Sequence, residues 1–313
     1  MTESTGRTAA LESADWAWRC SYCGEALAPH GEGLLCAEEQ RWFGTDDGVH
    51  RLLPAARRRE LLPFLELYQR VRRDEGWRAV PGLPDVPADD PHHAIWQARA
   101  ARFRQGLALC AAALERPRWD VLEVGAGCAW ASARLSSLGH RVAAVDVNLD
   151  PEDGLPAASR LVPAGTALPR AEAEMDALPV DAGSCDVVLA AGALHYTRDL
   201  TRTLVELRRV TRKGGLLLVL DSPVYRRRQD GEAMVAARMQ AHQEVYGFPV
   251  PRESQSSYLV VGELAGAFAS SGWALEVHGW PGRVREVLRD VVEIGRHGRR
   301  TARFPILLGR RDG

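Results

Sequence analysis

From Trp119 onward, short apolar runs alternate with stretches whose apolar residues recur at helical spacing. The runs are rich in Val and Leu and end at Gly or Asp, and they read WDVLEVG, RVAAVDV, CDVVLAAG and GGLLLVLDS. Continuous apolar runs of this kind are typical of strands that are buried on both faces. The segments near 129–138 and 198–211 between them are predicted to be helices. The alternation predicts an α/β fold with an open parallel sheet, which would bind ligands beyond the carboxyl ends of its strands.

The first part of the chain follows a different pattern. Residues 55–74 and 92–115 have apolar positions at helical spacing, and the proline-rich stretch 80–91 separates them. Another helix is predicted over 230–246. We therefore expect a flexible tail over 1–16, a small ribbon-like segment over 17–54, a helical lid or linker over 55–116, and the α/β domain over 117–313 with an insertion at 222–258.

Composition narrows the functional classes. The 313 residues carry a net charge of −1, which gives no general attraction to nucleic acid or to an anionic membrane. No apolar run approaches the roughly 20 residues that a membrane span needs, and the N-terminus lacks a signal-peptide pattern. Cys110, Cys128 and Cys185 have no paired spacing, as expected of free thiols. These features predict a cytoplasmic protein.

The stretch VLEVGAGCAWASARLSSLGHRVAAVDVN, residues 121–148, has the features of a nucleotide-type cofactor site. Gly125 and Gly127 follow the first predicted strand, and glycine lets the backbone turn sharply and lets a ligand approach closely. The helix that follows offers free N–H groups to an anion. Asp146, about 20 residues on, could accept both hydroxyls of a ribose. This pattern fits NAD as well as S-adenosylmethionine.

Three further features favour S-adenosylmethionine. Glu123 precedes the glycines, Asp176 lies before the third run, and a Gly-Gly turn in RRVTRKGGLLLVLDSP precedes the last run. In this order, the motifs of residues 119–222 resemble the class I S-adenosylmethionine-dependent methyltransferases, and in particular the methyltransferase type 11 group. Ala129 stands where that family often has a third glycine. The resemblance implies a Rossmann-like, seven-stranded, mostly parallel sheet with helices on both faces.

The resemblance also implies roles for individual residues. The glycines would pass under the methionyl part of S-adenosylmethionine, Asp146 would hold the ribose, Asp176 and the Ala177 backbone would contact the adenine, and Glu123 would lie near the ammonium group. The full set of implied cofactor contacts is Glu123, Gly125, Ala126, Gly127, Asp146, Val147, Asp176, Ala177 and Ala190.

Methyl transfer requires mainly that nucleophile, methyl group and sulfur be aligned, and a base only if the nucleophile must lose a proton early. His195 and Tyr196 follow the predicted fourth strand, and Tyr225 follows the fifth. We take these three as candidate catalytic residues, with Tyr246 as a further substrate contact. His195 could act as a base because its ordinary pKa is near neutrality, or it could pack against the cofactor.

The segment CSYCGEALAPHGEGLLCAEEQ contains Cys20, Cys23 and Cys36 but no fourth cysteine. It resembles the zinc-ribbon proteins that activate tRNA and translation-factor methyltransferases, and that register puts Glu39 at the fourth ligand position. It also resembles the ribbon of bacterial 23S rRNA guanine methyltransferases, whose ligand histidine is replaced by Gln40. Glu39 could complete a zinc site, His30 or His50 could replace it, or the ribbon could bind zinc weakly or not at all; we favour the last.

The sequence therefore predicts an enzyme that transfers a methyl group from S-adenosylmethionine to a small-molecule substrate, in specialised metabolism. An rRNA or tRNA methyltransferase is the first alternative, because of the ribbon. A non-catalytic cofactor-binding scaffold is the second, and an NAD-linked oxidoreductase is disfavoured by the Asp176 motif. The acceptor atom and the oligomeric state are left open.

Overall fold

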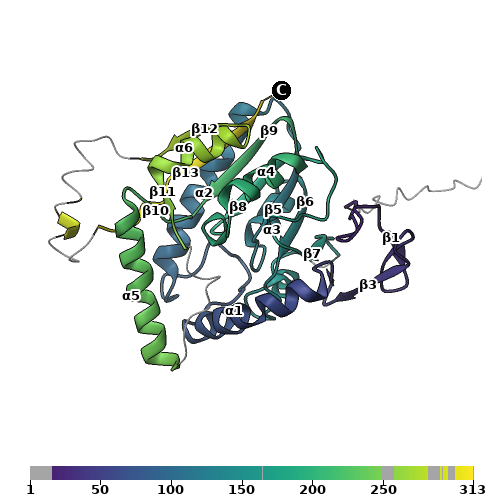
Figure 1. Ribbon diagram of the computed structural model, residues 1–313, viewed down its shortest axis with the longest axis horizontal. Coiled ribbons are helices and arrows are strands. Elements are labelled where there is room, and N and C mark those ends of the chain that lie inside the picture. The colour runs from purple at the N-terminus through teal and green to yellow at the C-terminus, as the bar shows by residue number, and fades with distance from the viewer. Residues whose placement is uncertain are drawn as a thin grey trace, which may run out of the picture.

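A computed structural model describes residues 16–163, 165–247, 257–280, 290, 292–294 and 300–312 of the chain (Figure 1). Its centre is a sheet in which seven strands follow the order β7-β6-β5-β8-β9-β13-β12. The five neighbouring strands β7, β6, β5, β8 and β9 are parallel to one another. Strand β13 is antiparallel to both of its neighbours, β9 and β12. The Rossmann-like, mostly parallel sheet is therefore confirmed. The strands are β5 (Asp120–Val124), β6 (Arg141–Asp146), β7 (Arg170–Glu172), β8 (Cys185–Ala191), β9 (Thr211–Leu220), β12 (Trp273–His278) and β13 (Ile306–Arg311).

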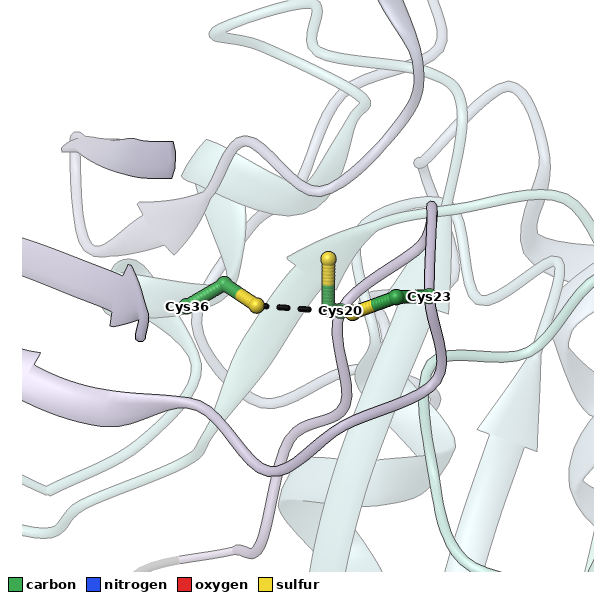
Figure 2. A group of neighbouring side chains, drawn as sticks. All are labelled: Cys20, Cys23 and Cys36. Carbon is green, nitrogen blue, oxygen red and sulfur yellow. Dashed lines mark hydrogen bonds between the residues drawn. The ribbon is translucent and has the colours of Figure 1, made fainter. Parts of the chain in front are cut away.

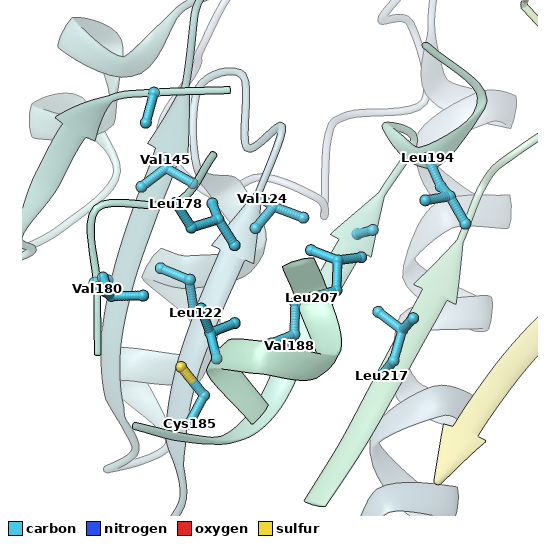
Figure 3. Packing of buried hydrophobic residues seen from close by; sticks show 14 of the residues in the cluster. Leu122, Val124, Val145, Leu178, Val180, Cys185, Val188, Leu194, Leu207 and Leu217 are labelled. Carbon is cyan, nitrogen blue, oxygen red and sulfur yellow. The ribbon is translucent and has the colours of Figure 1, made fainter. Parts of the chain in front are cut away.

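Helices cover both faces of this sheet, as the apolar runs predict. Successive side chains of one strand point to opposite faces of the sheet. Leu122 and Val124 therefore pack into one apolar cluster, and Val121 packs into the other. Figure 3 shows Leu122 and Val124 on the face where Leu207 of a helix packs. The helices on that face are α4 (Leu200–Val210) and α6 (Val261–Ser270), and those on the other are α2 (His93–Ala113) and α3 (Trp130–Ser137).

The ribbon-like segment extends the same sheet. Its strands are β1 (Ala28–His30), β2 (Gly33–Cys36), β3 (Arg41–Asp46) and β4 (Val49–His50), and they pair in antiparallel order. Strand β4 then pairs in parallel with β7, which makes one sheet of eleven strands. The carboxylate of Glu172 on β7 accepts a hydrogen bond from Arg51 Nε at 2.8 Å. The ribbon is thus joined to the edge of the α/β domain through backbone pairing and buried charge.

The remaining elements surround the carboxyl ends of the strands. Helix α1 (Ala55–Asp74) runs along one side of the sheet, between the ribbon and helix α5 (Arg228–Tyr246) in Figure 1. The guanidinium carbon of Arg70 on α1 lies 4.9 Å from the ring centroid of Tyr246 on α5, so the carboxyl-terminal ends of these two helices are in contact. The short elements are η1 (Leu155–Arg160), η2 (Leu194–Tyr196), β10 (Val224–Tyr225) and β11 (Leu259–Val260). Residues 248–256 of the predicted insertion lie outside the described residues.

The helices predicted at 55–74, 92–115, 129–138, 198–211 and 230–246 all lie within two residues of α1 to α5. Within the described ranges, no helix has both the length and the apolar character required to cross a bilayer.

Candidate active site

A cavity of about 360 Å³ opens at the carboxyl ends of the central strands. Gly125 follows β5, Asp146 ends β6, Gly192 follows β8 and Asp221 follows β9, and all four line the cavity. Strand β6 lies on one side of β5 and β8 lies on the other, so the strand order reverses at β5. Open parallel sheets bind ligands at such a point.

The loop after β5 takes a conformation that requires glycine. Gly125 has a φ of 61°, and a Cβ atom there would lie 2.4 Å from the Cβ of Ala193. Gly127 has a φ of 53°, and its N–H donates to Oδ2 of Asp146 at 2.7 Å. Ala129 is also left-handed, with a φ of 55°, a conformation that costs an alanine roughly 1–2 kcal/mol. The two glycines led us to expect a sharp turn here, and the positive φ angles of Gly125 and Gly127 agree with that expectation.

Asp146 sits at the centre of the predicted cofactor site. Its second carboxylate oxygen accepts from the Asn148 N–H at 2.7 Å, and burial raises the pKa of the group. A carboxylate has about four lone-pair sites, so two backbone bonds leave acceptor capacity for a ribose.

Six of the nine predicted cofactor residues line the cavity: Gly125, Ala126, Gly127, Asp146, Val147 and Asp176. Ala190 is fully buried inside β8, and its neighbour Ala191 lines the cavity instead. Ala177 donates its N–H to the Glu174 carbonyl at 3.2 Å and faces a second, adjoining cavity of about 790 Å³ beside the ribbon.

Glu123 is outside the cavity lining. Its carboxylate accepts from the N–H of Ser132 at 2.8 Å and from the Ser132 hydroxyl at 2.5 Å. Burial raises the pKa of Glu123 to about 7, although the two bonds from Ser132 oppose the rise. In this structure Glu123 binds one free N–H group, that of Ser132, in the first turn of α3, where the helix dipole favours a negative charge.

Of the three candidate catalytic residues, His195 and Tyr196 line the cavity. His195 Nδ1 lies 3.2 Å from the Ser222 hydroxyl, and the ring is buried. Burial, with the positive charges of Arg238 and Arg99, lowers the pKa of His195 to about 3. A ring that resists protonation so strongly is a weak general base. The packing alternative is the one that the geometry favours.

Tyr225 does not reach the cavity. The chain after β9 turns into β10, which pairs with β11, and Tyr225 is buried there with its ring 5.7 Å from that of Tyr258. Tyr246 lies on α5 against Arg70 and is also absent from the lining.

Helices α1 and α2 supply a wall that no motif identified. Phe64 and Tyr68 of α1 form an aromatic group with Tyr196, with ring centroids 5.8 to 6.3 Å apart. One face of α1 and two residues of α2 line the cavity: Leu61, Phe64, Leu65, Tyr68, Arg72, Trp96 and Arg99. The spacing of the α1 residues is helical, and the sequence led us to expect a lid or linker over 55–116, but it assigned none of these residues to the cavity.

The three ribbon cysteines come together (Figure 2), and none of them lines this cavity. The sulfur atoms of Cys20, Cys23 and Cys36 lie within 4.8 Å of one another. Backbone N–H groups of Tyr22 and Glu39 point at the Cys20 and Cys36 sulfurs at 3.5 Å, and the bond from Glu39 lowers the pKa of Cys36. Three sulfurs at this separation fit a thiolate-binding metal. Among the described residues, no carboxylate or imidazole joins the group, so Glu39, His30 and His50 are not in place as the fourth ligand.

Comparison with known proteins agrees with this geometry. Residues 122–219 match the family model described as a methyltransferase domain. An uncharacterized methyltransferase of Bacillus subtilis (strain 168), YodH, is 30% identical over 147 residues, which are 46% of this chain. The matched part of the chain spans 59% of that relative's length.

Two solved structures share the fold. A candidate methyltransferase from Bacillus halodurans C-125 aligns over 68% of this chain and 100% of its own, with 14% identity and a TM-score of 0.50. A candidate sarcosine dimethylglycine methyltransferase from Galdieria sulphuraria aligns over 79% of this chain and 98% of its own, with 12% identity and a TM-score of 0.51. Residues 122–219 thus match a methyltransferase domain, and they form part of a Rossmann-like sheet.

Proposed function

We propose that the whole chain transfers a methyl group from S-adenosylmethionine to a small molecule held in the cavity at the strand ends. The observation that carries the proposal is the composition of this cavity. One half has Gly125, Gly127, Asp146 and Asp176, and the other has the wall from α1 and α2.

The residues of the first half fit the cofactor. Asp146 has acceptor capacity for the ribose. Asp176, which is paired with Arg202 at 3.2 Å, lines the same cavity and would accept from the adenine amino group. When bound, S-adenosylmethionine supplies a methyl group on a positively charged sulfur. The chain then has to align the acceptor and exclude water, and this requires no strong base. The weak basicity of His195 is consistent with such a mechanism.

The wall from α1 and α2 favours a small acceptor over RNA. Leu61, Phe64, Leu65 and Trp96 give the cavity an apolar side, which suits a small organic molecule. A folded RNA would need an open basic approach, whereas the net charge of the chain is −1.

The test is a transfer assay with S-adenosylmethionine labelled at the methyl group. The full chain is incubated separately with a metabolite fraction below about 1 kDa and with total RNA. We expect label to enter the small-molecule fraction only. Label in RNA would support the rRNA or tRNA alternative, and cofactor binding without transfer to either fraction would support the scaffold alternative.

A further inference from the structure

Arg99 of α2 is a charged group of the cavity wall that the proposed function has not used. Its guanidinium carbon lies 4.9 Å from the ring centroid of Trp96 and 5.2 Å from that of Trp77. Both indoles are buried. Cation–π contacts of this kind hold a guanidinium in place without neutralising it.

Arg99 has no acceptor among the described residues. It makes no hydrogen bond and no ion pair with any part of the chain that the structure describes, although two neighbouring arginines do. Arg72 donates to Asp153 at 2.6 and 3.1 Å, and Arg102 donates to Asp221 at 2.5 Å. Burial lowers the pKa of Arg99, but an arginine side chain stays charged at neutral pH. The carboxylate of Asp221 acts on Arg99 electrostatically, but its hydrogen bond comes from Arg102. A part-buried charge with no acceptor of its own among the described residues is costly, so its presence needs an explanation.

Two phenol groups add to the excess of donors. Tyr68 and Tyr196 line the same cavity, and within the described ranges neither hydroxyl has a hydrogen-bond partner. Burial raises the pKa of both phenols, so both keep their protons. The charge of Arg99 acts on Tyr196, and Arg99 and Tyr68 also interact electrostatically.

Among the described residues, none of the carboxylates that line the cavity makes a hydrogen bond or an ion pair with these donors. Each already accepts from another group: Asp146 from two backbone N–H groups, Asp153 from Arg72, Asp176 from Arg202, Asp221 from Arg102 and Glu174 from Arg57. The cavity therefore has unsatisfied donors and no unpaired anion among these groups.

We infer that Arg99, with the hydroxyls of Tyr68 and Tyr196, binds a carboxylate carried by a ligand of this cavity. A planar guanidinium matches a carboxylate with two parallel hydrogen bonds, and such charge-assisted bonds are the strong ones. The inference rests on the proposed function for the identity of the ligands. The carboxylate belongs either to the amino-acid part of the cofactor or to the acceptor, and the experiment separates these sources.

The experiment compares the full-length wild type with Arg99→Met and Arg99→Lys by titration calorimetry. Arg104→Met is the matched control, because Arg104 lies on the same helix and is exposed. The first pair of probes is S-adenosylhomocysteine, which has the carboxylate, and 5′-methylthioadenosine, which lacks it. The second pair is benzoate and benzamide, added to protein that is saturated with S-adenosylhomocysteine.

If the carboxylate is the cofactor's, Arg99→Met weakens S-adenosylhomocysteine binding about tenfold or more and leaves 5′-methylthioadenosine unchanged. If it is the acceptor's, the wild type binds benzoate better than benzamide, and Arg99→Met removes this preference without affecting S-adenosylhomocysteine. In both cases Arg99→Lys falls between the two proteins. The inference is overturned if Arg99→Met alters neither S-adenosylhomocysteine binding nor the benzoate preference.

Thermal unfolding without ligand provides a second readout. Arg99→Met removes a charge that has no acceptor among the described residues, but it also removes the cation–π contacts with Trp77 and Trp96, so its melting temperature should stay within a few degrees of that of the wild type. A melting temperature several degrees lower would show that Arg99 is a structural residue and would overturn the inference. A wild type that binds neither nucleoside would instead contradict the proposed function.

Discussion

Arg72 on helix α1 donates two hydrogen bonds to Asp153, 81 residues further along the chain, at 2.6 and 3.1 Å. Asp153 lies in the loop between β6 and η1, directly beside the cofactor half of the cavity. This pair helps to hold α1 over the strand ends, together with the bonds from Arg57 to Glu174 and from Arg58 to Glu172. With α1 these bonds position the aromatic wall formed by Phe64 and Tyr68. Both side chains are largely buried, with 18% and 9% exposure.

The first prediction concerns this pair. Arg72→Met should lower the free energy of unfolding by about 3 kcal/mol, because it leaves the Asp153 carboxylate buried without its partner. The neighbouring Arg73 is the control, since its side chain is 58% exposed and lies 3.8 Å from Asp150. Arg73→Met should cost about 0.5 kcal/mol or less. Urea unfolding measures both, and equal effects of the two substitutions would contradict the role given to Arg72.

The second prediction concerns Asp146. Asp146→Asn should weaken S-adenosylhomocysteine binding about tenfold or more, because a neutral amide is a weaker acceptor for the ribose hydroxyls. Glu152→Gln serves as the control, since Glu152 is exposed in the same loop region and is paired with Arg160. Calorimetry well below the melting temperature measures both variants. Undiminished affinity in Asp146→Asn would remove Asp146 from the ribose role.

The strands, the main helices and the glycine loop could be predicted from the sequence because each has a local cause. Strands β5 and β8 are buried on both faces and so appear as continuous apolar runs, and the turn at Gly125 has no room for a side chain. These features need no knowledge of distant residues.

The acceptor half of the cavity could not be predicted in the same way. Tyr225 was chosen because it follows β9 closely, but the pairing of β10 with β11 turns it into the interior. Arg99 belongs to no motif, and only the placement of α2 against the sheet shows that it has no hydrogen-bond acceptor among the described residues. The position of α1 depends likewise on the contact between Arg72 and Asp153, which is distant in sequence.

The third prediction follows from the buried ring of His195. Its pKa is lowered to about 3 in the folded protein, by burial and by the charges of Arg238 and Arg99, while an unfolded histidine titrates near 6.5. The stability associated with the neutral ring is therefore fully present above about pH 6.5 and is lost as the pH falls from there toward 3. Between pH 8 and pH 5 the wild type should lose about 2 kcal/mol from this group.

The contribution of Glu123 to the free energy of unfolding changes with pH in the opposite direction. The effect of His195 must therefore be measured against a variant that lacks the ring. The pKa of Glu123 is raised to about 7, and its contribution is present at low pH and lost as the pH rises through that value. This contribution is common to wild type and His195→Gln and cancels in their difference. Urea unfolding at pH 8 and pH 5 should show a loss that is about 2 kcal/mol smaller in His195→Gln. The same loss in both proteins would mean that the ring titrates normally.

The fourth prediction concerns the metal in the ribbon. Three sulfurs are in place, but the described residues bring no fourth protein ligand to them, and a zinc site with three thiolates binds its metal less tightly than one with four. The protein purified in the presence of a mild chelator should therefore carry less than one equivalent of zinc by elemental analysis. Glu39→Ala should leave that amount unchanged, as should Glu38→Ala, its exposed neighbour and control.

Cys36→Ser should remove the remaining metal. The affinity for S-adenosylhomocysteine should stay within about twofold, because the residues lining the cofactor cavity begin at Leu61 and include none of the ribbon. Stoichiometric zinc that is lost in Glu39→Ala would show that the Glu39 carboxylate swings into the cluster and completes the site.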